Sequence, residues 1–160
     1  SETIESIAAH RWTEQFEALR MRTENYKQRT KDNVKVFLAN MGPIPQHKPR
    51  ADFSTGFFEV GAFEVIKNDG HEPTADAAKA ARESGADVVV ICSTDDTYPE
   101  LVPPLAKELK ETMPHVTVIL AGAPPKDLEP VYREAGVDDF ISVRANCYEI
   151  LNTLQDKKGM

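Results

Sequence analysis

The sequence predicts an α/β fold, a doubly wound five-stranded parallel sheet with helices on both faces, preceded by a long N-terminal helix. The strongest observation is the continuous apolar run at residues 87–93, which suits a central strand buried on both faces. A second observation is the alternation of short apolar runs with helical patterns between residues 34 and 155. Because the connections are short, we expect successive strands to be parallel and joined by helical crossovers.

The chain begins with a helical pattern over residues 3–28. Its apolar residues recur at spacings of three, four and seven, which places them in one stripe on one face of a helix. They are Ile4, Ile7, Ala8, Trp12, Phe16, Leu19 and Tyr26. The stripe must cover the rest of the domain or a missing neighbour, and we expect Trp12 and Phe16 to be buried against such a neighbouring domain or partner. We therefore divide the chain into a linker helix, residues 1–33, and an α/β domain, residues 34–160.

The first half of the α/β domain contains two expected strands, at residues 34–38 and 63–66. Three prolines within residues 40–50 predict an irregular loop after the first strand. A helix is expected from residue 51 to residue 60. Gly61 follows it and fits a left-handed C-terminal cap.

The second half supplies the remaining strands and helices. An alanine-rich helix, residues 74–83, is stopped by Gly85 and leads into the central strand. Thr97 and Glu100 have the spacing of a capping box that opens the next helix. The other expected strands cover residues 116–120 and 140–143, and the other helices cover residues 97–111, 127–135 and 146–155.

The expected strand order is 2-1-3-4-5, as in flavodoxin-like folds, with a switch point between the first and third strands. Open parallel sheets bind ligands outside the carboxyl ends of their strands at such a point. Polar residues 92–96 end the third strand, and His47 lies in the segment after the first. These two segments are therefore the candidates for chemistry.

Composition and charge restrict the partners. The 160 residues carry a formal net charge of -7, which argues against a nucleic-acid partner bound through its phosphates. No apolar stretch approaches the roughly 20 residues that span a bilayer, so we expect no membrane partner. Cys92 and Cys147 are too few for a disulfide framework and predict free, buried or half-buried thiols in a reducing cytoplasm.

Most chemistries of this fold class are excluded by individual residues. A phosphoryl-accepting receiver domain needs an acidic pair after the first strand and a lysine after the fifth, where Asn40 and Arg144 stand. A flavin-phosphate loop needs hydroxyl and amide donors where prolines occur. No glycine-rich phosphate motif is present. The role of His47 stays open, because this residue could ligate a metal at the switch point or be an exposed loop histidine.

Three segments, residues 36–43, 57–65 and 133–137, resemble the cobalamin-binding-type domain of methylmalonyl-CoA mutases. The resemblance covers the α/β domain, and the leading helix is similar to the linker that follows the barrel domain of those enzymes. In the cobalamin-binding members, Asp-x-His-x-x-Gly follows the first strand, and its histidine is the lower cobalt ligand. A Ser-x-Leu and a Gly-Gly motif line the pocket of the nucleotide tail.

The spacing of these motifs is kept here, whereas most of their residues are replaced. The motif positions hold Pro45, His47 and Arg50, then Cys92, Ser93 and Thr94, then Ala121 and Gly122. Of the motif residues, His47 and Gly122 alone persist. Pro45 replaces the aspartate that would bond the histidine, a loss that typically costs about 10–100-fold in metal affinity. Arg50 replaces a glycine and adds bulk and charge where the tail would pass. A second partial motif, residues 69–71, follows the second strand and is interpreted as a turn.

A chain that keeps the spacing of the cobalamin motifs but has lost most of their residues resembles the small, non-catalytic subunit of heterodimeric methylmalonyl-CoA mutases. The resemblance implies a structural domain without catalytic residues that binds no cofactor itself. Its complex would use adenosylcobalamin to interconvert methylmalonyl-CoA and succinyl-CoA, and its partners would be the large catalytic subunit and a barrel domain of its own chain. Two alternatives stay open. His47 could ligate cobalt with Ser93 serving for Cys92, or Asp95 could serve a carboxylate-based signalling domain.

Overall fold

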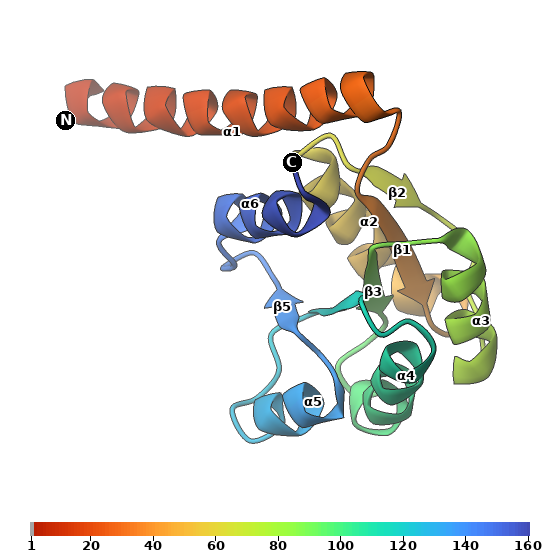
Figure 1. Ribbon diagram of the computed structural model, residues 1–160. Helices are drawn as coiled ribbons and strands as arrows, with labels where there is room; N and C mark the ends of the chain where they lie inside the picture. Colours follow the sequence, from red (N-terminus) through yellow and green to blue (C-terminus); the bar gives the residue numbers. More distant parts are fainter. Residues whose placement is uncertain (1) are drawn as a thin grey trace.

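Five parallel strands form one sheet in the order β2-β1-β3-β4-β5, which confirms the predicted topology (Figure 1). The structure is a computed structural model that describes the backbone of residues 2–160 and the side chains of residues 13–160. The strands are β1 Lys35–Asn40, β2 Glu64–Ile66, β3 Val88–Cys92, β4 Thr117–Ala121 and β5 Asp139–Ile141. All neighbouring pairs are parallel, as expected for strands joined by helices.

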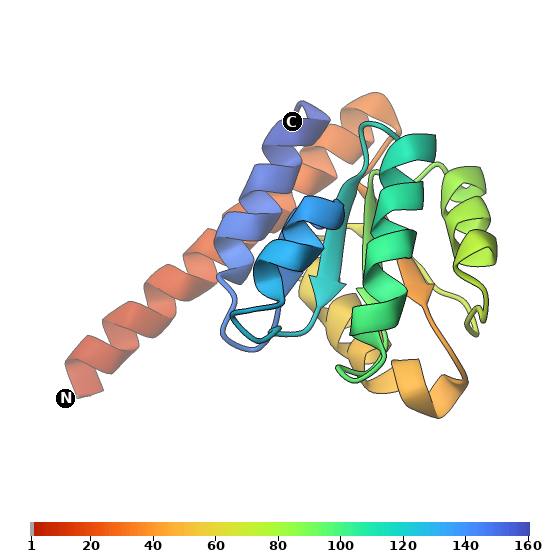
Figure 2. The ribbon, with the colours of Figure 1, turned by 90° about the horizontal axis from the view of Figure 1, so that it is seen from below.

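Helices cover both faces of this sheet (Figure 2). They are α1 Glu2–Thr30, α2 Ile44–Glu59, α3 Thr74–Ser84, α4 Tyr98–Thr112, α5 Glu129–Ala135 and α6 Cys147–Lys158. The core on one face is built with α1, α2 and α6, and the core on the other with α3, α4 and α5. Across the described residues, no helix combines the length and the apolar character that crossing a bilayer requires.

The central strand β3 explains why its sequence shows no alternation of polar and apolar residues. Val88, Val90 and Cys92 enter the core under α2 and α6, whereas Val89 and Ile91 enter the core under α3 and α4. All five are buried. A strand covered on both faces needs apolar side chains on each, so the whole run is apolar.

The predicted irregular loop after β1 is wrong, because α2 begins at Ile44 and not at residue 51. Pro45 stands in the first turn, where its missing N–H would have no partner inside the helix. Pro49 lies inside the helix and removes one backbone hydrogen bond there. His47 is therefore a helical residue and not a loop residue.

Two predicted caps are also wrong, and one is confirmed. The left-handed residue after α2 is Ala62, with φ 61°, rather than Gly61. Gly61 instead packs closely, since a Cβ added there would lie 3.4 Å from the side chain of Leu151. Thr97 precedes α4, but its side chain makes no capping hydrogen bond. Gly85, with φ 70°, ends α3 as predicted.

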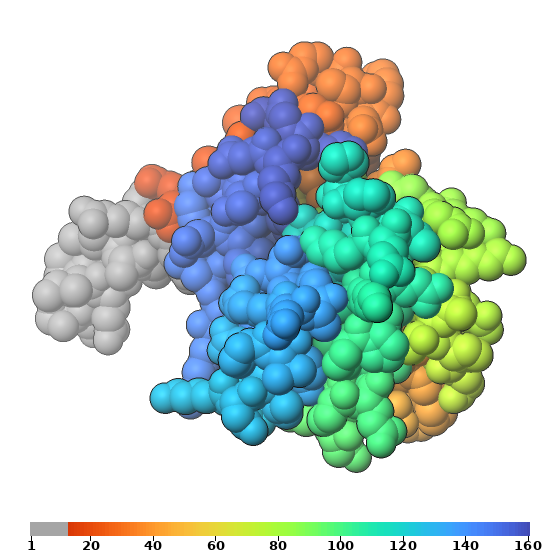
Figure 3. Space-filling model, turned by 60° about the horizontal axis from the view of Figure 1, so that its bottom comes forward, coloured from red at the N-terminus to blue at the C-terminus, as the bar shows by residue number. Residues whose placement is uncertain are grey.

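The second half of α1 lies directly against α6 (Figure 3). Leu19 is buried in the core that α6 covers. The ring of Phe16 meets the ring of Tyr148 edge-on, with 6.3 Å between centroids, so Phe16 packs inside the domain. Arg22 Nη2 pairs with Asp156 Oδ1 at 2.7 Å. Trp12 lies outside the residues whose side chains are described.

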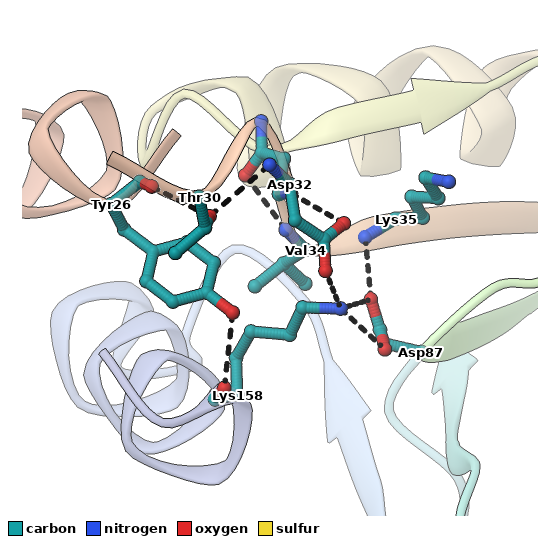
Figure 4. Close-up of polar contacts among 8 residues, drawn as sticks. Tyr26, Thr30, Asp32, Val34, Lys35, Asp87 and Lys158 are labelled. Carbon is teal, nitrogen blue, oxygen red and sulfur yellow. Dashed lines mark hydrogen bonds and ion pairs between the residues drawn. The ribbon is translucent and has the colours of Figure 1, made fainter. Parts of the chain in front are cut away.

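Lys158 and the residues around it connect four elements at the amino edge of the sheet (Figure 4). Lys158 Nζ lies 3.0 Å from Asp87 Oδ2 and 3.1 Å from Asp32 Oδ2. Asp87 Oδ2 also accepts the backbone N–H of Lys35 at 3.0 Å. The hydroxyl of Tyr26 reaches the carbonyl of Lys158 at 3.5 Å. The ends of α1 and α6 are thus tied to the starts of β1 and β3.

Asp32 is expected to make the domain more sensitive to acid. The hydrogen bond from the backbone N–H of Asn33 and the contact with Lys158 lower the pKa of the Asp32 carboxyl below its ordinary value of 3.8. The folded state therefore favours the ionised carboxylate. This stabilisation is complete above the ordinary pKa and is lost as the pH falls through the lowered one.

Urea unfolding of the wild type and of Asp32→Asn at about pH 6 and about pH 3 measures this contribution. Because Asp32 is partly exposed, the wild type should lose at most about 1 kcal/mol more than the variant between the two pH values. Equal losses in both proteins would contradict the assignment.

Candidate functional site at the carboxyl edge of the sheet

The loops after β1 and β3 meet at the carboxyl edge of the sheet. Asn40 at the end of β1 pairs with Cys92 at the end of β3, and the next residue, Met41, donates its N–H to the Cys92 carbonyl at 3.0 Å. Because β1 lies between β2 and β3, the sheet grows in one direction from β1 to β2 and in the other direction from β1 to β3. This is the predicted switch point, and the candidate residues lie around it.

Ser93 is the buried centre of this edge. Its Oγ donates to the Met41 carbonyl at 3.2 Å and accepts a hydrogen bond from Gln46 Nε2 at 2.8 Å. Thr97 Oγ1 lies 3.1 Å away and shares its single proton with the nearer Thr94 carbonyl at 2.7 Å. Ser93 has no exposed surface. A hydroxyl has one donor and two acceptor sites, so the donor site and one acceptor site of this side chain are used by the protein itself.

Arg50 reaches from α2 across the ends of β3 and β4. Its Nη1 donates to the Ser93 carbonyl at 2.9 Å and pairs with Asp95 Oδ1 at 2.8 Å. The guanidinium carbon lies 5.4 Å from the centre of the Tyr98 ring. A Cβ added at Gly122 would lie 3.3 Å from Nη1, so the guanidinium fills the space beside this glycine.

Arg50 remains charged in this position. Partial burial works to lower the pKa of its guanidinium, but the hydrogen bond to Asp95 and the neighbouring Tyr98 together raise it. A charged donor strengthens its hydrogen bonds to a carbonyl and a carboxylate. The contact between α2 and the end of β3 is therefore a charge-assisted one.

The hydroxyl of Tyr98 bridges the ends of β3 and β4. It accepts the backbone N–H of Ser93 at 3.0 Å and donates to the carbonyl of Ala121 at 2.6 Å. Tyr98 is buried, and this burial raises the pKa of its hydroxyl well above the ordinary value of 10.0. The group stays neutral and acts as a fixed link between the strands.

Cys92 and Thr94 are also engaged by the protein. Cys92 is completely buried, and its Sγ lies 3.6 Å from Ser54 Oγ. Burial raises the pKa of its thiol to about 12, so the nucleophilic thiolate is scarce at neutral pH. The carbonyl of Thr94 accepts the Thr97 hydroxyl at 2.7 Å. Both residues serve the packing of this edge.

His47 lies one turn before Arg50 on α2 and lines a different cavity. It is 3% exposed, and its Nδ1 lies 3.0 Å from the Gly42 carbonyl. A carbonyl only accepts, so Nδ1 carries the proton. Nε2 has no hydrogen-bond partner among the described residues. The expectation of an exposed loop histidine is wrong.

The structure places His47 in a different cavity from Ala121 and Gly122. His47 lines a cavity of about 230 Å³ between α2 and the segment after β2, together with Asn40 and Asn68. Ala121 and Gly122 line a second cavity of about 290 Å³ with Arg50, Phe53 and Val143. The side chains described, residues 13–160, contain no group of three or more His, Cys, Asp or Glu placed to hold a metal ion.

Two contributors to this site were missed from the sequence. Tyr98 directly follows the residue expected to cap α4, and an aromatic residue so close to residues 92–96 was an available signal. Gln46 gave no such signal in the sequence, because it was assigned to an irregular loop. The segment at residues 69–71 is a bend followed by a bridge and not a turn, and it lies beside the end of β1, where His71 pairs with Met41.

Curated relatives share the sequence along nearly the whole chain. The methylmalonyl-CoA mutase small subunit of Porphyromonas gingivalis is 31% identical over 160 residues, which are 99% of this chain and 24% of that protein. The small subunit of Streptomyces virginiae is 29% identical over 147 residues, or 92% of this chain and 22% of that protein. The chain spans about a quarter of the length of these relatives. The resemblance to mutase small subunits is confirmed.

Solved structures support the fold. A cobalamin-binding protein from Desulfitobacterium hafniense has a TM-score of 0.60 at 17% identity, covering 91% of this chain and 70% of that one. A CheY-like protein, tadZ of Pseudomonas aeruginosa, has a TM-score of 0.61 at 18% identity, covering 81% of this chain and 96% of that one. No protein-family model matches the chain. Identities this low show the shared flavodoxin-like fold alone.

Tyr98→Phe is expected to lower the free energy of unfolding by about 1–3 kcal/mol, because it leaves a buried N–H and a buried carbonyl without their partner. Urea unfolding followed by circular dichroism measures the loss. Tyr26→Phe is a matched control, since its hydroxyl makes only the long 3.5 Å contact with the Lys158 carbonyl. The control should change stability by less than about 0.5 kcal/mol. Similar losses in the two variants would argue against the bridge.

Proposed function

We propose that this chain is the C-terminal domain of the small subunit of an adenosylcobalamin-dependent methylmalonyl-CoA mutase. In this proposal the domain is structural, with a degenerate cobalamin motif and no catalytic residue. The complex as a whole is an isomerase that interconverts methylmalonyl-CoA and succinyl-CoA. Sequence similarity to mutase small subunits supports the assignment.

The observation that carries the structural interpretation is the place of Arg50. At the position where cobalamin-binding members have a glycine, its guanidinium lies between Ser93, Asp95 and Gly122. A nucleotide tail in this crevice would have to displace the ion pair and the hydrogen bond to the Ser93 carbonyl. The residues at this crevice do not fit a tail in that place.

The neighbouring residues support the same interpretation. Pro45 offers no carboxylate to His47, whose Nδ1 bonds to a backbone carbonyl instead. The hydroxyl of Ser93, which the alternative would use in place of Cys92, already donates to the Met41 carbonyl and accepts from Gln46 Nε2. Cys92, Thr94 and the carbonyl of Ala121 are likewise engaged.

The proposed partners are the large catalytic subunit, in a heterodimer, and a barrel domain of the same polypeptide. The relatives are about four times as long as this chain, which leaves room for such a domain. We assign residues 1–33 to the linker helix and residues 34–160 to the cobalamin-binding-type domain. A cytoplasmic location is supported by the free thiols of Cys92 and Cys147.

One observation favours the alternative, in which His47 is the lower axial ligand of cobalt. Protonation of Nδ1 leaves the lone pair on Nε2, and a carbonyl bonded to the other ring nitrogen is the usual arrangement behind a metal-binding histidine. Cobalamin would supply cobalt to this nitrogen, and the chain would hold the ring through Gly42.

Visible spectroscopy separates the two functions. The chain is titrated into hydroxocobalamin, and the spectrum is compared for the wild type, His47→Ala and the control His115→Ala, which removes an exposed histidine. The structural function predicts no spectral shift beyond that of His115→Ala. A shift that His47→Ala abolishes and His115→Ala retains would overturn it in favour of cobalt ligation. Co-purification with a mutase large subunit is the positive test.

A further inference from the structure

We propose that the first two turns of α2, residues 44–50, form a strap that opens and closes separately from the rest of the helix, with Arg50 as its clasp. In the closed state the strap covers the crevice at the ends of β3 and β4. This inference concerns the movement of the strap and holds whether or not the crevice binds a cofactor.

The strap has little helical stability of its own. Its N-cap is Pro43, whose side chain cannot cap the free N–H groups, and its first turn has no acidic residue to offset the helix dipole. Pro49 removes a further backbone hydrogen bond. The strap must therefore be held by contacts with the sheet.

His47 is buried and bonds to the Gly42 carbonyl, and two further polar side chains of the strap reach Ser93. Gln46 Nε2 donates to its hydroxyl at 2.8 Å and also reaches the Met41 carbonyl at 3.3 Å. Arg50 Nη1 donates to its backbone carbonyl at 2.9 Å and pairs with Asp95. Gly42, with φ 82°, lets the strap approach, since a Cβ there would overlap the side chain of Gln46.

The second half of α2 is held in a different way. Ser54 and Phe58 have no exposed surface, and Phe57 is 8% exposed. Phe57 and Phe58 lie in the core with Leu38 and Val90. Segments with few buried apolar contacts open at lower free energy than segments anchored in the core. The two halves of one helix thus differ in what holds them.

The clasp should respond to salt. The carboxylate side chain of Asp95 is 67% exposed, so its attraction to Arg50 is open to screening. The screening length falls from about 10 Å at about 0.1 M salt to about 3 Å at about 1 M. Added salt should therefore favour the open strap, whereas the buried apolar contacts of the second half are not weakened in this way.

Amide hydrogen exchange, measured by NMR at pH 7, tests the inference. The amides of His47, Lys48 and Arg50 report on the strap, and those of Phe57 and Phe58 report on the second half. In the wild type the strap amides should exchange faster. Arg50→Ala should accelerate them about ten- to a hundredfold, the effect of losing hydrogen bonds made by a charged group, with the second half unchanged.

Two further variants complete the experiment. Lys48→Gln is the matched control on the same helix, because its ion pair with Asp52 joins side chains that are 60% and 65% exposed, and it should change exchange less than about twofold. Asp95→Asn should accelerate the exchange of the strap amides and abolish its salt dependence. This variant replaces Arg50→Ala in the experiment if Arg50→Ala does not fold. If Arg50→Ala accelerated exchange equally in both halves of α2, or had no larger effect than Lys48→Gln, the proposal that the strap opens separately would be overturned.

Discussion

A single guanidinium connects the helix after β1 with the ends of β3 and β4. Arg50 bonds to the carbonyl of Ser93, pairs with Asp95, lies over the ring of Tyr98 and fills the space beside Gly122. The closure of the crevice and the position of the first two turns of α2 depend on this contact. Its charge matters, because a charged donor strengthens hydrogen bonds to carbonyl and carboxylate oxygens.

Ser93 and Tyr98 extend this arrangement into the sheet. At the end of β1, Asn40 Oδ1 and His71 Nδ1 are buried without a hydrogen-bond partner among the described residues. At the ends of β3 and β4, in contrast, the Ser93 hydroxyl bonds to Met41 and Gln46 and the Tyr98 hydroxyl bridges the two strands, so these polar groups are satisfied internally. A ligand entering here would have to break bonds of the protein before forming its own. This is the physical difference between an edge that keeps the architecture of a binding site and one that is prepared to bind.

The parts of the fold that follow from local chemistry were predictable. The apolar run at β3 and the cap at Gly85 are properties of neighbouring residues, and both are confirmed. The start of α2 was not predictable, because the effect of a proline depends on how far it lies from the first helical residue. Residues 92–96 could be recognised as the edge of the site. The bond between Gln46 and Ser93 could not, because it joins residues 47 positions apart that share no pattern.

The seam between α1 and α6 bears on how the chain folds during synthesis. Arg22 donates to the Met160 carbonyl at 2.7 Å, and Gln155 Nε2 donates to the Leu19 carbonyl at 2.8 Å, so partners more than a hundred residues apart meet. The ribosome makes α1 before α6, so the surface that shields Leu19 is translated more than a hundred residues later. Until α6 has been made, part of the apolar side of α1 is therefore uncovered. Chaperones or a neighbouring segment could bind it during this time.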